Sequence, residues 1–318
     1  MKSWPGAKAA AALLSIAAAH LWIDPASAAN RWGADYFPNV PLTTQDGATV
    51  HFYDDLLKGR VVAVNVIYTQ CENECPLETA KLAQVQRLLG ERVGRDVFFY
   101  SITIDPKRDT PKVLKAYAEK FGVGPGWLFL TGKAEDIKLV TKKLGLSRRN
   151  DSTSRDGHAA SLMLGNEPAG QWMRNSAVDN PRFLAVKIAD IAGWQEQKPR
   201  KSYAAVATLP APNKAEYLFG SRCGACHTIE QGDKVGPDLS GVTTRRTHAW
   251  LARYLTEPEK MLAEGDPIAT ALFDRYKSVR MPNLSLSQDD IAALLSYLEA
   301  QSSARRPLIR RNPVPPAR

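Results

Sequence analysis

A Cys-x-x-Cys-His motif, formed by Cys223, Cys226 and His227, restricts the fold of this chain more strongly than the rest of the sequence. Two thiols at this spacing can bond the two vinyl groups of one haem, and the histidine that follows then lies under the iron as an axial ligand. The alternative is a zinc half-site, but the neighbouring sequence supplies no second Cys/His pair to complete a tetrahedral set. The motif therefore predicts one covalently attached haem c.

Charge is nearly balanced over the body of the chain, although the whole sequence has 42 Lys and Arg residues against 33 Asp and Glu, a net charge of +9. Much of the excess comes from arginines after Gln301, in a segment without acids. We therefore expect no nucleic-acid partner. The tail, residues 302–318, is rich in proline and arginine, and is expected to be disordered and to be a candidate for contact with an anionic membrane surface.

The N-terminus has the pattern of an export signal over residues 1–28. Lys2 and Lys8 provide positive charge around the start of an apolar stretch from Ala9 to Ile23. Ala26–Ala28 then has the small-x-small spacing of a cleavage site. The apolar stretch is shorter than the roughly 20 residues that span a bilayer as a helix. We expect a cleaved signal and a periplasmic protein; an uncleaved signal that anchors the chain to the membrane is the alternative.

Between residues 36 and 195, β-branched runs alternate with segments of helical periodicity. The expected strands are Val61–Tyr68, Val97–Ile104 and Trp127–Leu130, with a hairpin formed by Ser161–Leu164 and Gln171–Met173. Helices are expected after Pro76, from Thr110 as N-cap to Phe121, and from Ala134 to Leu144. This alternation predicts an α/β domain with a largely parallel sheet that is covered by helices on both faces.

The pattern changes after residue 195. Residues 196–214 contain three prolines and a basic run, and are expected to link two domains. Residues 215–301 are helical in character, which predicts an all-α second domain. The last helix has the clearest signals, with Ser287 as N-cap and an apolar face of Ile291, Leu294, Leu295 and Leu298.

A second cysteine pair, Cys71 and Cys75, lies between the first expected strand and a helix. Backbone N–H groups and the dipole at a helix start stabilise thiolates. Two thiolates favour a soft ion such as Cu(I), and the pair can instead close into a disulfide, as a redox centre or as a staple. His158 is the histidine that could join this site, although a lone histidine is more often a surface or core residue. From the residues alone these alternatives remain open.

Residues 215–301 resemble a class I cytochrome c, a small helical fold around one haem. The segment Gly236–Leu239 matches the family segment whose proline carbonyl accepts a hydrogen bond from the proximal imidazole, here that of His227. Met281 matches the family's distal thioether ligand, whereas the competing Met261 lies in a helical stretch where packing is expected. The resemblance implies iron ligation by His227 and Met281, which raises the reduction potential and suits electron transfer.

Residues 36–195 resemble the SCO/SenC family of thioredoxin-fold copper proteins. The matching segments are YTQCENECPLETAKL, SITIDPKRDTPKVLKAYAEKFG and HAASLMLGNEPAGQW. The resemblance implies a copper ion held by Cys71, Cys75 and His158. For the family's DPxRDT loop, here Asp105–Thr110, we expect turn formation and helix capping in preference to direct catalysis. Two further histidines have no partner motif and are expected to be structural or solvated: His51 and His248.

Together the two domains predict a periplasmic redox protein that joins a copper and dithiol site to a one-electron haem. The SCO/SenC resemblance implies copper delivery to the dinuclear copper centre of cytochrome c oxidase, or reduction of that centre's cysteines. One haem supplies one electron and disulfide reduction needs two, which favours copper cycling. Two alternatives remain: a thiol–disulfide reductase or thiol peroxidase using Cys71 and Cys75, and an electron carrier whose first domain only docks partners. The expected partner is the copper-bearing oxidase subunit or another periplasmic redox protein.

Overall fold

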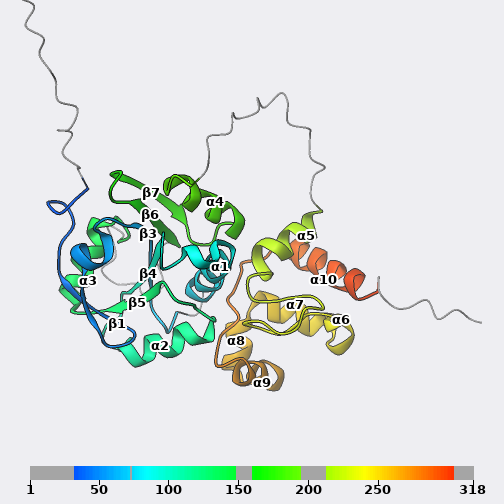
Figure 1. Ribbon diagram of the computed structural model, residues 1–318. Helices are drawn as coiled ribbons and strands as arrows, with labels where there is room; N and C mark the ends of the chain where they lie inside the picture. The colour runs from blue at the N-terminus through cyan, green and yellow to red at the C-terminus, as the bar shows by residue number, and fades with distance from the viewer. Residues whose placement is uncertain (1–31, 72–73, 148–159, 195–212, 304–318) are drawn as a thin grey trace, which may run out of the picture.

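The structure is a computed structural model, and it describes residues 32–71, 74–147, 160–194 and 213–303. The expected export signal, most of the expected linker, the tail from residue 304 and His158 lie outside the described residues. Figure 1 shows an α/β domain and a helical domain, with helix α1 on the side of the sheet that faces the helical domain. Among the helices of the described residues, none combines the length and the apolar character needed to cross a membrane.

The first domain is built on a seven-stranded sheet in the order β2-β1-β5-β4-β3-β6-β7. The strands are β1 (Pro41–Thr44), β2 (Thr49–His51), β3 (Val61–Ile67), β4 (Phe98–Thr103), β5 (Trp127–Thr131), β6 (Ser161–Asn166) and β7 (Gln171–Ser176). The expected strands and hairpin are confirmed. The prediction of a largely parallel sheet is wrong. Strands β3, β4 and β5 are parallel to one another, but the hairpins β1–β2 and β6–β7 pair with them in the antiparallel direction. A hairpin at each edge reverses the chain through a short turn, which a parallel pair cannot do.

Helices cover both faces of this sheet, as predicted. They are α1 (Glu74–Leu89), α2 (Pro111–Lys120), α3 (Ala134–Lys143) and α4 (Pro181–Ile191), with a π-helical turn at Phe52–Leu57 and a 3-10 turn at Gly90–Arg92. Side chains of β3 point alternately into two hydrophobic cores, one on each face of the sheet. Ala63 and Ile67 pack with α1, α2 and α4, whereas Val62 and Val64 pack with α3 and the π-helical turn. Burial on both faces explains the uninterrupted apolar run of this strand.

Every regular element that the structure describes in the second domain is helical, which confirms the all-α prediction. These elements are α5 (Lys214–Leu218), a π-helical turn (Phe219–Cys223), α6 (Val242–Arg245), α7 (His248–Thr256), α8 (Pro258–Ala263), α9 (Pro267–Arg275) and α10 (Gln288–Ser303). Helix α10 packs against α5, α6 and α7. Its start is capped as predicted, because Ser287 Oγ accepts the Asp290 N–H at 3.2 Å while the Asp290 carboxylate accepts the Ser287 N–H at 3.3 Å.

The two domains share one continuous apolar core along α1. Ala225 and Leu284 of the helical domain belong to the same buried cluster as the apolar residues of α1, and Val279 packs against it. Gln84, on α1, also donates a hydrogen bond from Nε2 to the carbonyl of Gly224 at 2.7 Å. The helix that carries Cys75 in its first turn therefore packs along the Cys-x-x-Cys-His motif.

Candidate functional site

Cys71 and Cys75 lie on the turn between β3 and α1. The Cys71 N–H donates to the carbonyl of Tyr68 at 3.2 Å, which starts the turn. The Cys75 N–H then donates to Cys71 Sγ at 3.3 Å, and a bond of this kind favours the thiolate form of the accepting sulfur. Cys71 and Cys75 are both in the reduced form, outside any disulfide. The fold thus brings the two cysteines together at the start of a helix, where the sequence predicts them.

The two thiols differ in burial. Cys75 is 0% exposed, whereas Cys71 is 7% exposed and lines a cavity. Burial raises the pKa of the Cys75 thiol well above its ordinary value, and the hydrogen bond and charge of Cys71 raise it further. Cys75 therefore holds its proton at neutral pH, and Cys71 is the sulfur that a small ligand reaches first.

Asp109 fixes the turn that precedes Cys71. Its carboxylate accepts hydrogen bonds from the Thr69 N–H at 3.1 Å, from the Thr69 hydroxyl at 2.5 Å and from the Thr103 hydroxyl. These bonds join the carboxyl ends of the neighbouring strands β3 and β4. Thr110 follows as the N-cap of α2. The loop therefore forms turns and caps a helix, as the sequence predicts, and it also orients the backbone that leads to Cys71.

Glu78 is a buried carboxyl group beside the thiols that the sequence analysis missed. It lies three residues after Cys75 and is fully buried. Asn65 Nδ2 donates to Glu78 Oε2 at 3.2 Å, whereas Oε1 has no hydrogen-bond partner among the described residues. Burial raises the pKa of Glu78 to about 8, although the bond from Asn65 acts in the opposite direction. The available signal was a glutamate in an otherwise buried helical turn directly after the cysteines.

A cavity of about 390 Å³, which we call the seam pocket, lies between the two domains beside Cys71. Its walls are Thr69, Gln70, Cys71, Pro76, Tyr117, Lys120, Phe121, Ser278, Val279 and Arg280. The first seven residues come from the α/β domain and the last three from the helical domain. Access to the Cys71 thiol is therefore controlled by both domains.

His158, the expected third copper ligand, lies outside the described residues. Within those residues, no group of three or more His, Cys, Asp or Glu side chains could hold a metal ion. The structure thus describes the two-sulfur part of the expected copper site, and the role of His158 stays a prediction. His51 and His248 are exposed, and each lies beside an exposed carboxylate, which agrees with the solvated role expected for them.

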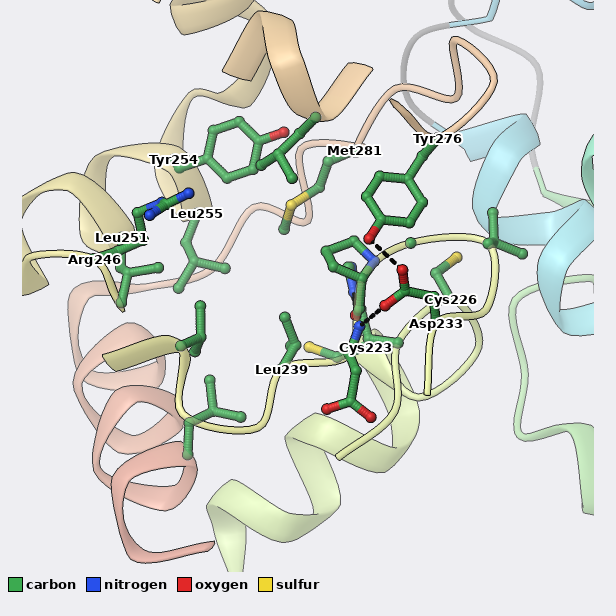
Figure 2. A pocket seen from close by; sticks show the side chains of 18 of the residues that line it. Cys223, Cys226, Asp233, Leu239, Arg246, Leu251, Tyr254, Leu255, Tyr276 and Met281 are labelled. Carbon is green, nitrogen blue, oxygen red and sulfur yellow. Dashed lines mark hydrogen bonds between the residues drawn. The ribbon is translucent and has the colours of Figure 1, made fainter. Parts of the chain in front are cut away.

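The Cys-x-x-Cys-His motif lines a larger cavity, of about 610 Å³, which we call the haem cavity. Figure 2 shows Cys223 and Met281 on opposite sides of this cavity, and leucine side chains such as Leu239 and Leu255 form part of its walls. Met261, the competing methionine, is buried in α8 and packs in the protein interior, as predicted.

His227 is held in the orientation of a metal ligand. Its Nδ1 lies 2.8 Å from the carbonyl of Pro237, so Nδ1 must carry the proton, and Nε2 is the nitrogen that can bind a metal. Burial lowers the pKa of His227, which keeps the imidazole neutral, although the Pro237 bond opposes the shift. Gly236 fits tightly beside the ring, because a Cβ there would lie 2.7 Å from His227 Cε1.

Asp238 organises the loop that carries Pro237. Its carboxylate accepts hydrogen bonds from the backbone N–H groups of residues 230–232 and from the hydroxyl of Thr228 at 2.7 Å. Burial works against ionisation, but these hydrogen bonds outweigh it and hold the pKa of Asp238 well below its ordinary range. The ionised carboxylate therefore fixes the position of the carbonyl that orients His227.

These residues fit a covalently attached haem. Two thiols, an oriented imidazole nitrogen and a thioether sulfur surround one mostly apolar cavity, and this is the donor set of a c-type haem with His/Met ligation. The residues that would hold the group are Cys223, Cys226, His227 and Met281. Such a group would supply one-electron chemistry.

Comparison with protein families gives a match for each domain. The family model described as SCO1/SenC matches residues 30–192, which is 163 of the 318 residues. The model described as Cytochrome c matches residues 213–302.

Individual relatives match the first domain. The chain is 39% identical over 92 residues to an SCO2-like protein of Rickettsia felis, which is 29% of this chain and 43% of that protein. It is 38% identical over 92 residues to the SCO1 protein homolog of Bacillus subtilis, which is 29% of this chain and 46% of that protein. The chain thus spans less than half the length of these curated relatives. The solved structure of a SCO1/SenC family lipoprotein from Bacillus anthracis matches 51% of this chain and 98% of its own, with 28% identity and a TM-score of 0.43.

Proposed function

The chain belongs to the SCO1/SenC family and continues into a cytochrome c domain, and from this we propose that it is a copper-binding redox protein of cytochrome c oxidase assembly. Copper is the cargo. Cys71 and Cys75 receive it together with His158, and the protein delivers it to the copper centre of the oxidase or prepares that centre's cysteines for metal. The alternation of copper between two charge states is a one-electron change, which matches the chemistry that one haem supplies.

The observation that carries the proposal is the position of the dithiol at the seam between the domains. Cys71 opens into the seam pocket, and Pro76, next to Cys75, lines both this pocket and the haem cavity. Thiolate sulfur selects a soft ion such as Cu(I). Copper cycling requires a copper site next to the group that supplies one electron, and a site at Cys71 and Cys75 that shares a wall with the haem cavity has this arrangement.

Copper titration of the haem-loaded protein tests the proposal. We expect one copper ion per chain, with affinity at least tenfold lower in Cys71→Ser and His158→Ala, since each removes a ligand. His51→Ala is the matched control, because His51 is exposed and lies outside the site; it should bind copper like the wild type. In cells, Cys71→Ser should lower the copper content of the oxidase. Wild-type protein that binds no copper, together with normal oxidase in Cys71→Ser cells, would refute the proposal.

A thiol–disulfide reductase or thiol peroxidase is the second candidate, and the unequal burial of the two cysteines favours it. Cys71 lines the seam pocket, whereas Cys75 is fully buried and protonated. The Cys71 sulfur can attack a disulfide or peroxide in the pocket, and Cys75 can then displace the bound group to close a disulfide with Cys71. His158→Ala distinguishes the candidates, because it should weaken copper binding and leave stopped-flow disulfide or peroxide reduction intact. An electron carrier whose first domain only docks partners would instead show the same haem reduction kinetics in Cys71→Ser and Cys75→Ser.

The location and partners form part of the proposal. The pattern of residues 1–28 supports export to the periplasm, and cell fractionation with N-terminal sequencing would test both export and cleavage. We propose the copper-bearing oxidase subunit, or another periplasmic redox protein, as the partner. Truncation after Gln301 should weaken any salt-sensitive binding to anionic vesicles if the basic tail contacts the membrane surface.

A further inference from the structure

The seam pocket and the haem cavity share part of their walls. Pro76, Val279 and Arg280 line both cavities. Val279 and Arg280 directly precede Met281, which lines the haem cavity, while Ser278 lines the seam pocket. Residues 278–281 therefore form one short segment that contacts both sites (Figure 2 shows the Met281 end).

The segment begins in strained backbone. Lys277 and Ser278 have φ angles of 56° and 57°, in the left-handed region that is unfavourable for a residue with a β-carbon. Two hydrogen bonds hold this turn, from the Ser278 N–H to the Phe273 carbonyl at 2.9 Å and from the Val279 N–H to the Tyr276 carbonyl at 3.1 Å. Strain of this kind persists only where the surroundings impose it, and it clusters at sites that bind ligands or switch conformation.

Residues 278–280 form part of the wall of the seam pocket near Cys71, so a group placed in this pocket pushes on them. Val279 is packed against the apolar core that runs along α1. Pro76 is a rigid ring one residue after Cys75, so it yields little. A group attached to Cys71 in the seam pocket therefore faces Val279 and Arg280 on the wall that this pocket shares with the haem cavity.

We propose that residues 278–281 are a positioning segment that couples the two sites. Filling the seam pocket at Cys71 moves Val279 and Arg280, and this changes how the Met281 thioether is presented to the haem iron. The inference rests on the proposed haem attachment, and it adds a link between the state of the thiol site and the axial ligand. Since coupling between binding sites is reciprocal, a change at Met281 also alters the affinity of the seam pocket.

Alkylation of the full-length, haem-loaded, copper-free protein with iodoacetamide tests this coupling. The Cys71 sulfur bonds to the CH₂ carbon, iodide leaves and the thiol proton passes to the buffer, so a neutral group is attached to Cys71 inside the pocket. Mass spectrometry identifies the adduct. We expect the haem midpoint potential to shift and the near-infrared absorption of the methionine–iron(III) bond to change. If the coupling differs tenfold between the oxidised and the reduced haem, the midpoint potential shifts by about 59 mV, because one electron is transferred.

Three variants assign the effect to the segment. Treated Cys71→Ser should show no shift, because Cys75 is fully buried. Val279→Ala should reduce the shift by more than twofold, since it removes the methyl groups that the adduct displaces. Val242→Ala makes the same truncation in a haem-cavity wall that does not adjoin the seam pocket, and should keep the shift. Arg280→Gln replaces Val279→Ala if that variant folds poorly.

The outcomes separate this inference from the proposed function. An unchanged potential and unchanged absorption in alkylated protein with covalent, Met281-ligated haem would overturn the coupling and leave the proposed function standing. Equal shifts in the wild type and Val279→Ala would show that the effect bypasses the segment, which also overturns it. Protein that attaches no haem would refute the proposed function, and the coupling with it.

Discussion

Glu78 is a carboxyl group near the thiols that changes charge close to neutral pH. Burial raises its pKa to about 8 in the folded protein, whereas a glutamate in an unfolded chain ionises near a pKa of about 4.3. Between these values the folded state holds a proton that the unfolded state has released, so the free energy of unfolding falls as pH rises. The loss is complete once the pH has passed about 8.

Glu78→Gln should remove most of this pH dependence, because an amide does not ionise. We expect the variant to gain stability relative to the wild type as the pH rises from 5 to 8.5, by about 1.4 kcal/mol for each unit of pH over which only the folded state holds the proton. Urea unfolding at several pH values measures this. Glu135→Gln, at an exposed position on α3, should retain the wild-type slope. Parallel curves for the wild type and Glu78→Gln would contradict the prediction.

Residues with local partners could be predicted from the sequence. Thr110 and Ser287 cap helices that begin within three residues of them, and His227 meets Pro237 through a recognisable motif. The bonds around Glu78 could not be predicted. Ser101 donates to Asn65 Oδ1 at 2.7 Å, and Trp127 Nε1 donates to Ser101 Oγ at 2.9 Å. That chain of bonds crosses three strands, so it depends on strand order, which local periodicity does not reveal.

Helix α1 performs two tasks at the scale of the element. Its first turn holds Cys75, and its later turns pack against the Cys-x-x-Cys-His motif through Gln84 and Gly224. The start of the helix was evident from Pro76 and the apolar spacing. Its second contact surface was not, because a helix buried on two sides loses the one-sided apolar pattern that identifies a surface helix.

Gln84→Glu should weaken the contact between the domains, because it places a carboxylate against the Gly224 carbonyl and removes a 2.7 Å hydrogen bond. A net loss of about 0.5–1.5 kcal/mol for the bond, with added repulsion, should increase amide hydrogen exchange over residues 224–236 by tenfold or more. Leu88→Gln is the control on the same helix, since Leu88 is 53% exposed, and it should leave exchange unchanged. Equal exchange in both variants would show that this bond does not hold the interface.

The whole molecule is more closely assembled than the sequence indicates. A proline-rich segment over residues 196–214 is expected to link two domains, and it leaves their relative placement open. In the structure, Ala225 and Leu284 are buried in the core cluster of the first domain. Contacts between segments so distant in the sequence have no local signature, which explains why the sequence predicts both fold classes but not how the domains dock.

Cleavage between the domains tests how much of this docking depends on the covalent connection. A protease site inserted between residues 195 and 212 should, after cleavage, leave two fragments that elute together in size-exclusion chromatography at micromolar concentration. The buried apolar contact and the Gln84–Gly224 bond provide the attraction. The same cleavage in Gln84→Glu should release a larger fraction as separate fragments. Complete separation of the wild-type fragments would mean that the docked state needs the tether, and the two cavities would then share their wall only because the linker keeps the domains close together.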